Sequence, residues 1–492
     1  MIKIIRIFLV FLVSAVNVFC SSINIYHTSD THGYYYPHLI DGKEIGGFAA
    51  LSSLIAEDKN PRLLLDSGDY SSGTFEAAES KGLLSVQFMN MAGYNGAAIG
   101  NHEGDFGEKA MLDNIAAAKF DVLAANIFDE RTGTYPEKIK PFAVYKVKDK
   151  KIAVIGIAKN PLPASKRIKT IGLAKALKKA LADIKETKPD ATILLIHESF
   201  TDGLPKKIKN FLNDAANSGA IDLVLGGHFH KIIQNEKIDG TVFVESGGEL
   251  KGASKIILNF SDKTGLLENI NSEFIVLNNL KIKENSEIKI FADSNYRKDA
   301  DYVLSYAKER IEKDRYFQDG SVDSPLGNLF ADAIKKGTGA DIALHNTGGL
   351  RADMPKGPIT KRTVFGISPF SNKIIVAEVD GGFIKKFLLK SLKQNGCSFQ
   401  FSGLSVKYRY KNNRPEIIQI LVNGKPIENK KLYSLALNDY IAAGNSKGYM
   451  FKNVLNKKYF GDVSASQLFE NYIKSNPQGI YGAKTGRIIK EK

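Results

Sequence analysis

Side chains of the kinds that bind metal ions occur repeatedly in this sequence, directly after short apolar runs. The runs are rich in Ile, Leu and Val, which is typical of buried strands. Five segments follow such runs: His27-Thr28-Ser29-Asp30-Thr31-His32, Asp66-Ser67-Gly68-Asp69, Gly100-Asn101-His102-Glu103-Gly104-Asp105, His197-Glu198 and Gly226-Gly227-His228-Phe229-His230. Open α/β sheets build their sites just beyond the carboxyl ends of their strands. We therefore expect these five segments to lie close together.

The residue types in these segments favour a metal site for phosphorus chemistry. A single Asp-x-His pair is more often a polar loop, and His197 alone could be a core histidine. Together, however, the segments hold six of the eight histidines in the chain, with Asp30, Asp69 and Asn101. Imidazole and carboxylate suit zinc, manganese or iron. Two such ions that share a carboxylate form the clamp used for in-line displacement at phosphorus.

Glycines accompany the candidate ligands at positions 68, 100, 226 and 227. A residue without a side chain permits a sharp turn and a close approach of the backbone to an ion. The glycines therefore fit a metal site built from tight loops.

The chain that must position these residues has 492 residues, which is too long for one hydrophobic core. Strand-like and helix-like stretches alternate over residues 21–278, which predicts an α/β catalytic domain. Residues 279–315 are charged and compatible with a helix, and we interpret them as a linker helix. Residues 316–492 contain further strands and helices, which predicts a second, α+β domain.

Residues 1–20 have the pattern of a secretory signal peptide. Lys3 and Arg6 precede a short apolar run over residues 7–19, and Cys20 follows it. The run is shorter than the ~20 apolar residues of a membrane-spanning helix. We expect cleavage and export to a periplasmic, secreted or cell-surface location, with no transmembrane anchor left. The minority alternative is a lipoprotein acylated at Cys20.

Composition excludes fibrous and disordered classes and favours an anionic partner. The chain is 43% hydrophobic and has a formal net charge of +15. The lysines are dispersed, so many of them simply coat polar helix faces. The sequence contains no Walker-type phosphate loop. After signal cleavage Cys397 is the single remaining cysteine, which excludes an intramolecular disulfide.

The order of the five segments resembles that of the calcineurin-like metallophosphoesterases. More narrowly, it is similar to their 5′-nucleotidase branch, which includes secreted bacterial 5′-nucleotidase/UDP-sugar hydrolases and 2′,3′-cyclic phosphodiesterases. The resemblance extends over nearly the whole mature chain, through Gly46-Gly47-Phe48-Ala49, Leu326-Gly327-Asn328-Leu329, Asn346-Thr347-Gly348-Gly349-Leu350-Arg351 and Gly486-Arg487-Ile488. It implies an N-terminal β-sandwich flanked by helices (αββα), a linker helix and a C-terminal α+β substrate-binding domain.

The resemblance also implies a role for each residue of the metal site. One ion would be held by Asp30, His32 and His230, the other by Asn101, His197 and His228, with Asp69 bridging them. A water or hydroxide between the ions would be the nucleophile. His102 would stabilise the transition state or protonate the leaving oxygen, and Asp105 would orient its ring. Asp105 lies three residues after His102, which agrees with that role. Asp105 could also be a simple acidic residue of a turn.

In the second domain the resemblance implies nucleotide-binding residues. Arg351 would contact phosphate or ribose, and Phe370 and Tyr440 would sandwich the base. Asn372, in the same segment as Phe370, is a further candidate for substrate binding. Aromatic rings stack on any nucleobase, so the rings do not select one. Each ring taken singly could also be an ordinary core aromatic.

Two departures from the family pattern put the substrate in doubt. The stretch at 319–322 lacks the arginines usual before the Leu-Gly-Asn-Leu block, and Arg315 is the nearest candidate. The loop at 444–449 is one residue longer and lacks the acidic residue that contacts ribose. We expect an exported dinuclear-metal phosphohydrolase acting on a small-molecule nucleotide, with no obligate protein partner. The alternatives are a UDP-sugar or 2′,3′-cyclic nucleotide substrate, and a non-catalytic surface or nucleic-acid-binding protein.

Overall fold

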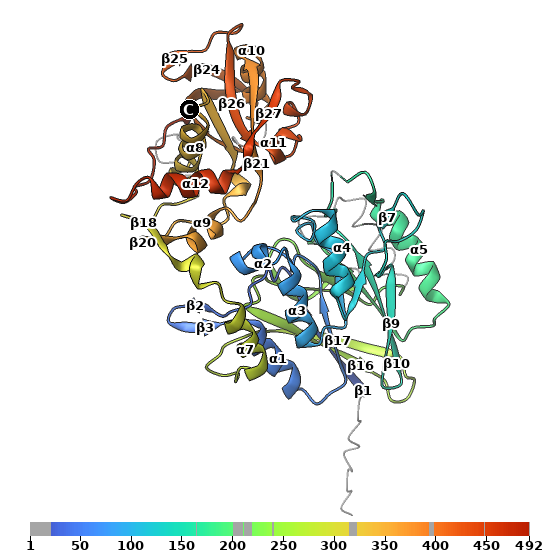
Figure 1. Cartoon of the computed structure of the whole chain (residues 1–492). Coiled ribbons are helices and arrows are strands. Elements are labelled where there is room, and N and C mark those ends of the chain that lie inside the picture. Colours follow the sequence, from blue (N-terminus) through green and yellow to red (C-terminus); the bar gives the residue numbers. More distant parts are fainter. Residues whose placement is uncertain are drawn as a thin grey trace, which may run out of the picture. The chain divides into compact units, whose positions relative to one another are not determined.

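The computed structural model of the chain divides into two compact units (Figure 1). Unit 1 comprises Met1–Tyr70 and Ser85–Ile290, and unit 2 comprises Ser71–Leu84 and Phe291–Lys492. The structure describes residues 21–163, 165–199, 210, 219–238, 241–313, 322–392, 398–446 and 448–491. The signal peptide predicted for residues 1–20 lies outside them. Among the helices in the described ranges, none is long and apolar enough to span a membrane.

Unit 1 contains two large sheets with the element order of an α/β domain. The seven-stranded sheet consists, in spatial order, of β17 (Leu267–Val276), β16 (Gly252–Phe260), β1 (Ser21–Thr28), β4 (Arg62–Asp66), β5 (Gly96–Ala98), β6 (Asp121–Leu123) and β8 (Ile139–Lys140). The six-stranded sheet consists of β14 (Ile232–Ile238), β15 (Thr241–Ser246), β13 (Leu223–Gly226), β12 (Ala191–Ile196), β10 (Lys150–Ile157) and β9 (Phe142–Val147). Two small sheets pair β2 (His38–Ile40) with β3 (Lys43–Ile45) and β7 (Ile127–Asp129) with β11 (Ile168–Thr170).

The two large sheets pack face to face as a sandwich, because both faces of their central strands are apolar. In β12, Leu195 joins the core between the sheets, together with Ile25 and Leu65 of the other sheet. The alternate residue Leu194 packs instead with Leu177 of a helix, α5 (Leu173–Lys185). This period of two is what a strand buried on both faces requires. The predicted α/β sandwich flanked by helices is confirmed.

Further helices in the described part of unit 1 include α1 (Phe48–Glu57), α3 (Leu83–Ala92) and α4 (Glu108–Ala117). Phe48 of α1 stacks on Phe88 of α3 with ring centroids 5.4 Å apart, and Tyr35 stacks on Phe88 at 4.5 Å. These contacts fix the segment after β1 on the helices.

The central strands run parallel, which places their carboxyl ends at one edge. In the first sheet β1 pairs parallel with β4, and β4 with β5. In the second sheet β10, β12, β13 and β15 are parallel in succession. The predicted ligand segments follow β1, β4, β5, β12 and β13.

Unit 2 is an α+β domain, as predicted. Its five-stranded sheet consists of β22 (Phe399–Ser402), β19 (Ile342–Asn346), β26 (Leu432–Asn438), β21 (Lys373–Asp380) and β27 (Lys457–Ser464). A four-stranded sheet contains β25 (Lys425–Pro426), β24 (Arg414–Val422), β23 (Leu404–Lys411) and β28 (Ile488–Lys490), and a two-stranded sheet pairs β18 (Val303–Ala307) with β20 (Gly357–Thr360). The helices are α2 (Phe75–Glu79), α8 (Pro325–Thr338), α9 (Lys361–Ile367), α10 (Gly381–Ser391), α11 (Asp439–Ala442) and α12 (Ala465–Lys474), with short 3-10 turns at Thr347–Gly349 and Phe451–Asn453.

The region predicted as a linker helix, residues 279–315, contains a single α-helix in its described part, α7 (Ser286–Asn295). A short 3-10 turn follows at Lys298–Asp301, and β18 then pairs with β20. Apolar and aromatic residues over 302–306 favour a strand once a partner edge is available. The helix is therefore shorter than the region assigned to it.

Segment 71–84 belongs to unit 2 although it lies far from the rest of that unit in sequence. Arg362 donates to both carboxylate oxygens of Glu76 at 2.8 Å. Glu76 is buried, and its charge is balanced by this guanidinium. Phe75 also meets Phe365 edge-on, with centroids 5.8 Å apart.

The Gly-Arg-Ile motif near the end of the chain has a structural role in unit 2. The buried carboxylate of Asp323 accepts from the backbone amides of Gly486 and Arg487 at 3.1 Å. The guanidinium of Arg487 forms two bonds of 2.8 Å to Asp332. These contacts hold the terminal strand β28 in its sheet.

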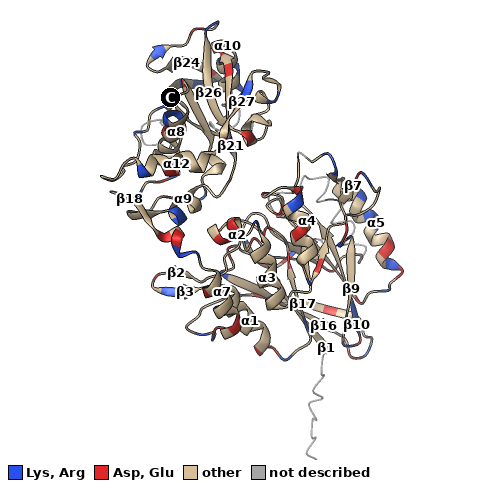
Figure 2. Cartoon of the chain, viewed as in Figure 1, with Lys and Arg blue, Asp and Glu red and all other residues tan. Residues whose placement is uncertain are grey.

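Charged residues of both signs are interspersed along the elements of each unit (Figure 2). On α5, for example, Lys179 pairs with Asp183 one turn later. The net charge of +15 is therefore spread over many elements, in agreement with the dispersed lysines of the sequence.

Candidate metal centre

The predicted ligand residues of unit 1 form two groups. Within each group the candidate ligand atoms all lie within 4.8 Å of one another. The groups are Asp30, His32 and His230, and Asp69, His197 and His228. The structure thus brings together residues that are up to 200 positions apart. The second group contains Asp69, which the resemblance places between the ions, together with His197 and His228.

In the first group two imidazoles and a carboxylate converge. The Nε2 atoms of His32 and His230 lie 3.2 Å apart. The Oδ1 atom of Asp30 lies 3.6 Å from Nε2 of His230. The Asp30 carboxylate is held from behind by the backbone amide of His228, at 2.9 and 3.1 Å from its two oxygens. One small cation could contact all three side chains.

In the second group His197 joins the two sets of ligands. Its Nε2 atom lies 2.9 Å from Oδ2 of Asp69 and 3.8 Å from Oδ1 of Asp30. Its Nδ1 atom donates to the carbonyl oxygen of Ser67 at 2.8 Å. A backbone acceptor on Nδ1 is typical of metal-binding histidines, because it directs the other nitrogen to the ion.

Asn101 supplies a further observation in favour of a cation. Its Oδ1 atom is buried and has no hydrogen-bond partner among the described residues. The Nε2 atom of His197 is close to Asp69 but not in hydrogen-bond geometry with any described group. Buried polar atoms without partners are rare in proteins. Here an amide oxygen and an imidazole nitrogen both lack a hydrogen-bond partner. A borderline divalent ion can bind both of these atoms as ligands.

The backbone at these ligands is strained. Five candidate ligands have φ in the left-handed region: Asp30 (52°), His32 (49°), Asp69 (60°), His228 (76°) and His230 (55°). This conformation costs about 1–3 kcal/mol at a residue other than glycine and occurs preferentially at functional sites. The fold therefore keeps these side chains in positions that the local sequence does not favour.

Two glycines permit the close approach of the ligand loops. A Cβ atom on Gly100 would lie 2.1 Å from Oδ1 of Asp69, and one on Gly227 would lie 3.0 Å from Oδ2 of Asp30. Any larger residue at position 100 would displace Asp69. The expected role of these glycines is confirmed.

Glu103 holds two ligand loops together, a role that sequence reasoning missed. Its buried carboxylate accepts from the backbone amides of Asp69 (3.0 Å), Tyr70 (2.8 Å) and Gly100 (2.6 Å). Burial and the nearby Asp69 raise the pKa of Glu103. The sequence signal was an acidic residue directly after Asn101-His102, but its three partners lie in backbone that only the fold brings near.

His102 and Asp105 form the predicted pair beside the ligands. The Nδ1 atom of His102 lies 2.7 Å from Oδ2 of Asp105. The His102 amide donates to Oδ1 of Asp69 at 2.8 Å, and its ring meets the edge of the His32 ring at 5.3 Å between centroids. His102 thus contacts the ligands while its side chain stays 18% exposed, which leaves it accessible to a substrate.

Burial and neighbouring charges shift the pKa values of the candidate ligands. Burial raises the pKa of Asp30 to about 7. Burial lowers the pKa of His228 to about 3. At His197 burial acts in the same direction, but Asp69 and Asp30 outweigh it and raise the pKa to about 10. A cation would take the place of the His197 proton, because ligand histidines bind in the neutral form.

The predicted substrate-binding residues lie in unit 2. Asn372 donates to Asp439 at 3.1 Å, which ties the segment of Phe370 to α11, the helix that carries Tyr440. Tyr440 is 42% exposed. Arg351 is exposed and is anchored by its backbone amide, which donates to the carbonyl of Ile367 at 2.8 Å. The structure therefore places the two ring-bearing segments side by side.

Arg315, the arginine nearest to the Leu-Gly-Asn-Leu block, and Lys447 of the altered loop at 444–449 lie outside the described residues. Residues 444–446 and 448–449 are described, and the amide of Asn445 donates to the carbonyl of Tyr440 at 3.3 Å. The altered loop is thus continuous with the Tyr440 helix.

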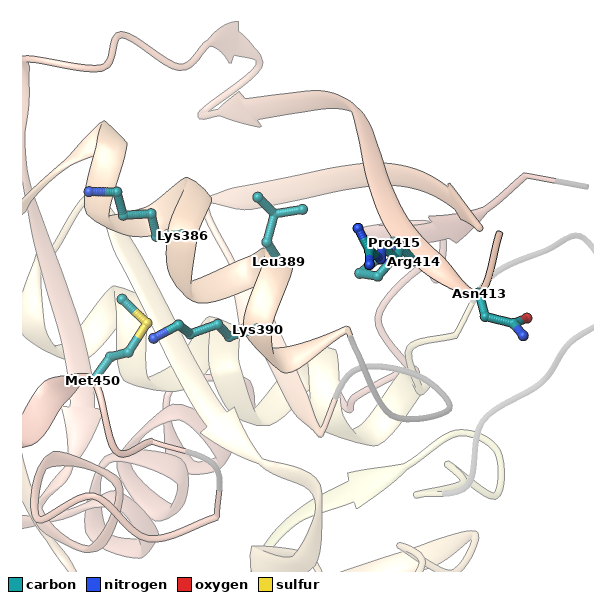
Figure 3. Close-up of a pocket in the computed structure, with 7 residues that line it drawn as sticks. All are labelled: Lys386, Leu389, Lys390, Asn413, Arg414, Pro415 and Met450. Carbon is teal, nitrogen blue, oxygen red and sulfur yellow. The ribbon is translucent and has the colours of Figure 1, made fainter. Parts of the chain in front are cut away.

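Unit 2 also contains a cavity of about 600 Å³ beside α10 (Figure 3). It is lined by Lys386, Leu389, Lys390, Asn413, Arg414, Pro415 and Met450. None of the predicted substrate-binding residues lines it. In Figure 3 Lys386 and Lys390 extend from the same helix in the same direction, away from Arg414.

Comparison with known proteins matches both units. The calcineurin-like phosphoesterase family matches residues 23–232, and the C-terminal domain of 5′-nucleotidases matches residues 306–453. A 5′-nucleotidase of Vibrio vulnificus is 25% identical over 87% of this chain and 85% of its own length. The trifunctional nucleotide phosphoesterase YfkN of Bacillus subtilis is 26% identical over 95% of this chain, which spans only 35% of that relative.

A solved structure shows the same fold. The crystal structure of a 5′-nucleotidase precursor from Thermus thermophilus aligns with a TM-score of 0.81 at 23% identity, covering 95% of this chain and 99% of that one. The fold, the two matched domains and the metal-binding residue groups agree. The chain belongs to the 5′-nucleotidase family of calcineurin-like metallophosphoesterases, which are metal-dependent phosphoric ester hydrolases.

Proposed function

We propose that this chain is an exported phosphohydrolase that holds two divalent metal ions and removes phosphate from nucleotides. The observation that carries the proposal is the pair of ligand groups, joined by His197, which lies within 4 Å of both Asp30 and Asp69. Two adjacent groups with a shared carboxylate are the arrangement expected for a dinuclear site.

The residues present fit borderline ions such as zinc or manganese. Asp30, His32 and His230 would hold one ion, and Asn101, His197 and His228 the other, with Asp69 between them. When bound, two such ions supply Lewis acidity and activate water for in-line attack at phosphorus.

His102 would act on the ester. Its Nδ1–H donates to Asp105, which fixes the ring and leaves Nε2 as the atom that faces a leaving oxygen. A ring in this position can donate a proton to that oxygen or stabilise the charge that develops there. Asp105 is then an orienting residue.

Unit 2 would recognise the nucleotide. Tyr440 and Phe370 would stack on the base, Arg351 would contact phosphate or ribose, and Asn372 would support the ring-bearing segments through its bond to Asp439. The exposed ring of Tyr440 supports this role, since an exposed aromatic ring is available for stacking. The relatives named as 5′-nucleotidases and nucleotide phosphoesterases agree with a nucleotide substrate.

Export rests on the sequence pattern of residues 1–20 alone. Cleavage after this segment would leave an N-terminus at the start of β1. Sequencing the N-terminus of protein recovered from the medium or periplasm tests this part separately.

The test of the catalytic proposal is metal dependence with a substrate panel. Purified full-length protein is stripped with a chelator, assayed with AMP, UDP-glucose and 2′,3′-cyclic AMP, and then reloaded with zinc or manganese. We expect activity to disappear, to return with metal at two ions per chain, and to be highest with AMP. Full activity in protein shown by elemental analysis to be metal-free would refute the proposal.

A matched pair of histidine variants controls for non-specific effects. His197→Gln should lose metal and activity. His38→Gln should keep both, because His38 lies outside the two ligand groups and Gln can replace its bond to the Glu249 carbonyl. Preference for UDP-glucose or the cyclic nucleotide would assign one of the alternative substrates, and retained metal without any hydrolysis would favour a binding protein.

A further inference from the structure

His27 is a buried histidine between the two large sheets of unit 1, and it belongs to neither ligand group. Its side chain is fully buried. Its Nε2 atom lies 2.8 Å from Oγ of Ser67, which follows β4 in the same sheet. Its Nδ1 atom lies 2.6 Å from Oγ of Ser246, at the end of β15 in the opposite sheet. The ring thus connects the two sheets next to the loops that carry the ligands.

The hydrogen bonds continue on both sides of the ring. Oγ of Ser246 lies 2.8 Å from Oγ of Ser254 on β16, which in turn accepts from Nε2 of Gln234 on β14 at 2.8 Å. On the other side Ser67 donates its hydroxyl proton to the carbonyl of Leu225 on β13 at 2.9 Å. The chain of polar groups crosses repeatedly between the two sheets, beside the apolar side chains that form the core between them.

The partners of Ser67 determine where the proton sits on His27. The carbonyl of Leu225 can only accept, so the single hydroxyl proton of Ser67 is directed to it. Nε2–H of His27 must then donate to Ser67. Burial lowers the pKa of His27 to about 3, so the ring carries one proton, and the contact with Ser67 places that proton on Nε2.

Ser67 transmits this constraint to a candidate ligand. Its amide donates to the carbonyl of Thr28 at 3.0 Å, and its hydroxyl is fixed by His27 and Leu225. Its carbonyl oxygen accepts from Nδ1 of His197 at 2.8 Å. With the amide and hydroxyl of Ser67 held in this way, its carbonyl oxygen holds Nδ1 of His197, and Nε2 of the same ring lies 2.9 Å from Asp69.

We infer that His27 is a positioning residue for the metal centre, which acts through Ser67 to orient His197 for the ion held with Asp69, Asn101 and His228. The inference rests on the proposed metal site and adds to it a residue that contacts neither metal nor substrate. Partners that orient a ligand histidine typically contribute 10- to 100-fold in metal affinity.

Two substitutions of His27 separate donor from acceptor. In His27→Gln the amide nitrogen takes approximately the place of Nε2 and keeps the donor to Ser67. In His27→Asn the shorter amide group takes approximately the place of Nδ1, so the contact with Ser246 remains and the donor to Ser67 is lost. We expect affinity for one of two Zn²⁺ ions to fall about 10- to 100-fold in His27→Asn and to stay near wild type in His27→Gln.

Zn²⁺ affinity is measured on the full chain by competition with a chromophoric chelator, which needs no catalytic activity. Thermal unfolding of the metal-free proteins runs in parallel and monitors folding. Ser67→Ala should weaken the same ion, and the double variant with His27→Asn should weaken it no further, because both remove one connection.

The outcomes distinguish this inference from the proposed function. Wild-type protein that binds no Zn²⁺ would end the proposed metal site itself. Wild-type protein that binds two ions, with all variants binding them equally, would overturn only the role of His27. Equal losses in His27→Gln and His27→Asn would show a packing effect and also overturn it. If His27→Asn fails to fold, a normal Zn²⁺ affinity in Ser67→Ala would by itself overturn the role of His27.

Discussion

The candidate metal centre of unit 1 and the residues proposed to bind the nucleotide in unit 2 are built differently. In unit 1 four candidate ligands, Asp30, His32, Asp69 and His197, are buried, and five have left-handed backbone. Glu103 and the amide of His228 hold the loops that carry the ligands. In unit 2 Arg351 is exposed, Tyr440 is 42% exposed, and the segments of Phe370 and Tyr440 are tied by the bond from Asn372 to Asp439.

The difference teaches which of the proposed residues are fixed before a ligand arrives. Metal ligands must keep their geometry to within a fraction of an ångström, so several hydrogen bonds are needed to hold the backbone that carries them. A stacking ring tolerates any base and several orientations, so it needs little support. Variants in unit 1 should therefore affect the chemical step and metal content, and variants in unit 2 should affect substrate binding.

The largest of these effects is expected at His102. We predict that His102→Ala lowers kcat by about 10²–10⁴-fold, the usual contribution of a positioned acid or base. Metal content should stay at two ions per chain, because His102 contacts the ligand loops through its backbone amide. Steady-state kinetics with elemental analysis check both statements. The loss of one ion would show that His102 is itself a ligand and that the site is misassigned.

A smaller effect concerns His345, a buried histidine of unit 2 that belongs to neither ligand group. Burial lowers its pKa to about 4 from the ordinary value of 6.5. The unfolded chain therefore binds more protons between these values, and the folded state loses stability as the pH falls from 6.5 through 4, by about 3 kcal/mol in all.

Urea unfolding at about pH 7 and about pH 4.5 measures this difference. In His345→Gln the loss of stability on acidification should be smaller than in wild type, since the titrating group is gone. An identical pH dependence in the two proteins would show that His345 is not protonated on unfolding in this range. Any loss of folding stability at low pH would then have to come from another buried group.

The smallest effect is expected at Tyr440. Stacking on a base contributes ~1–3 kcal/mol, which corresponds to roughly 5- to 150-fold in affinity. We predict that Tyr440→Ala raises KM for AMP in this range and leaves kcat and metal content unchanged. Hydrolysis of p-nitrophenyl phosphate, which has no base, should be unaffected.

Tyr459→Ala is the matched control, because Tyr459 is 65% exposed on β27 and has no assigned role. An equal rise in KM in both variants, or a fall in kcat for Tyr440→Ala, would contradict the division of labour between the units.

Much of the fold and the composition of the site could be predicted from local patterns. The apolar residues at 192–196 form the strand β12 (Ala191–Ile196), and the spaced apolar residues over 383–392 lie in the helix α10 (Gly381–Ser391). Apolar periodicity is a local property, so it is visible without a fold. By contrast, Val303–Ala307 lies in the region interpreted as a linker helix but forms a strand. Its partner strand β20 lies some fifty residues away, so the pairing is not visible in the local sequence.

The sequence by itself determined the types and order of the side chains that can bind metal, because each follows a recognisable strand. Only the tertiary structure decided which of these side chains share a group and that Glu103 bonds to two ligand loops. It also decided that Arg362 binds Glu76 within unit 2, and that Ser67 contacts both His27 and His197. The physical reason is that these contacts join residues distant in the chain, and many of them involve backbone amides and carbonyls. Every residue carries a carbonyl and all but proline an amide proton, so the sequence cannot distinguish the few that the fold places within hydrogen-bonding distance.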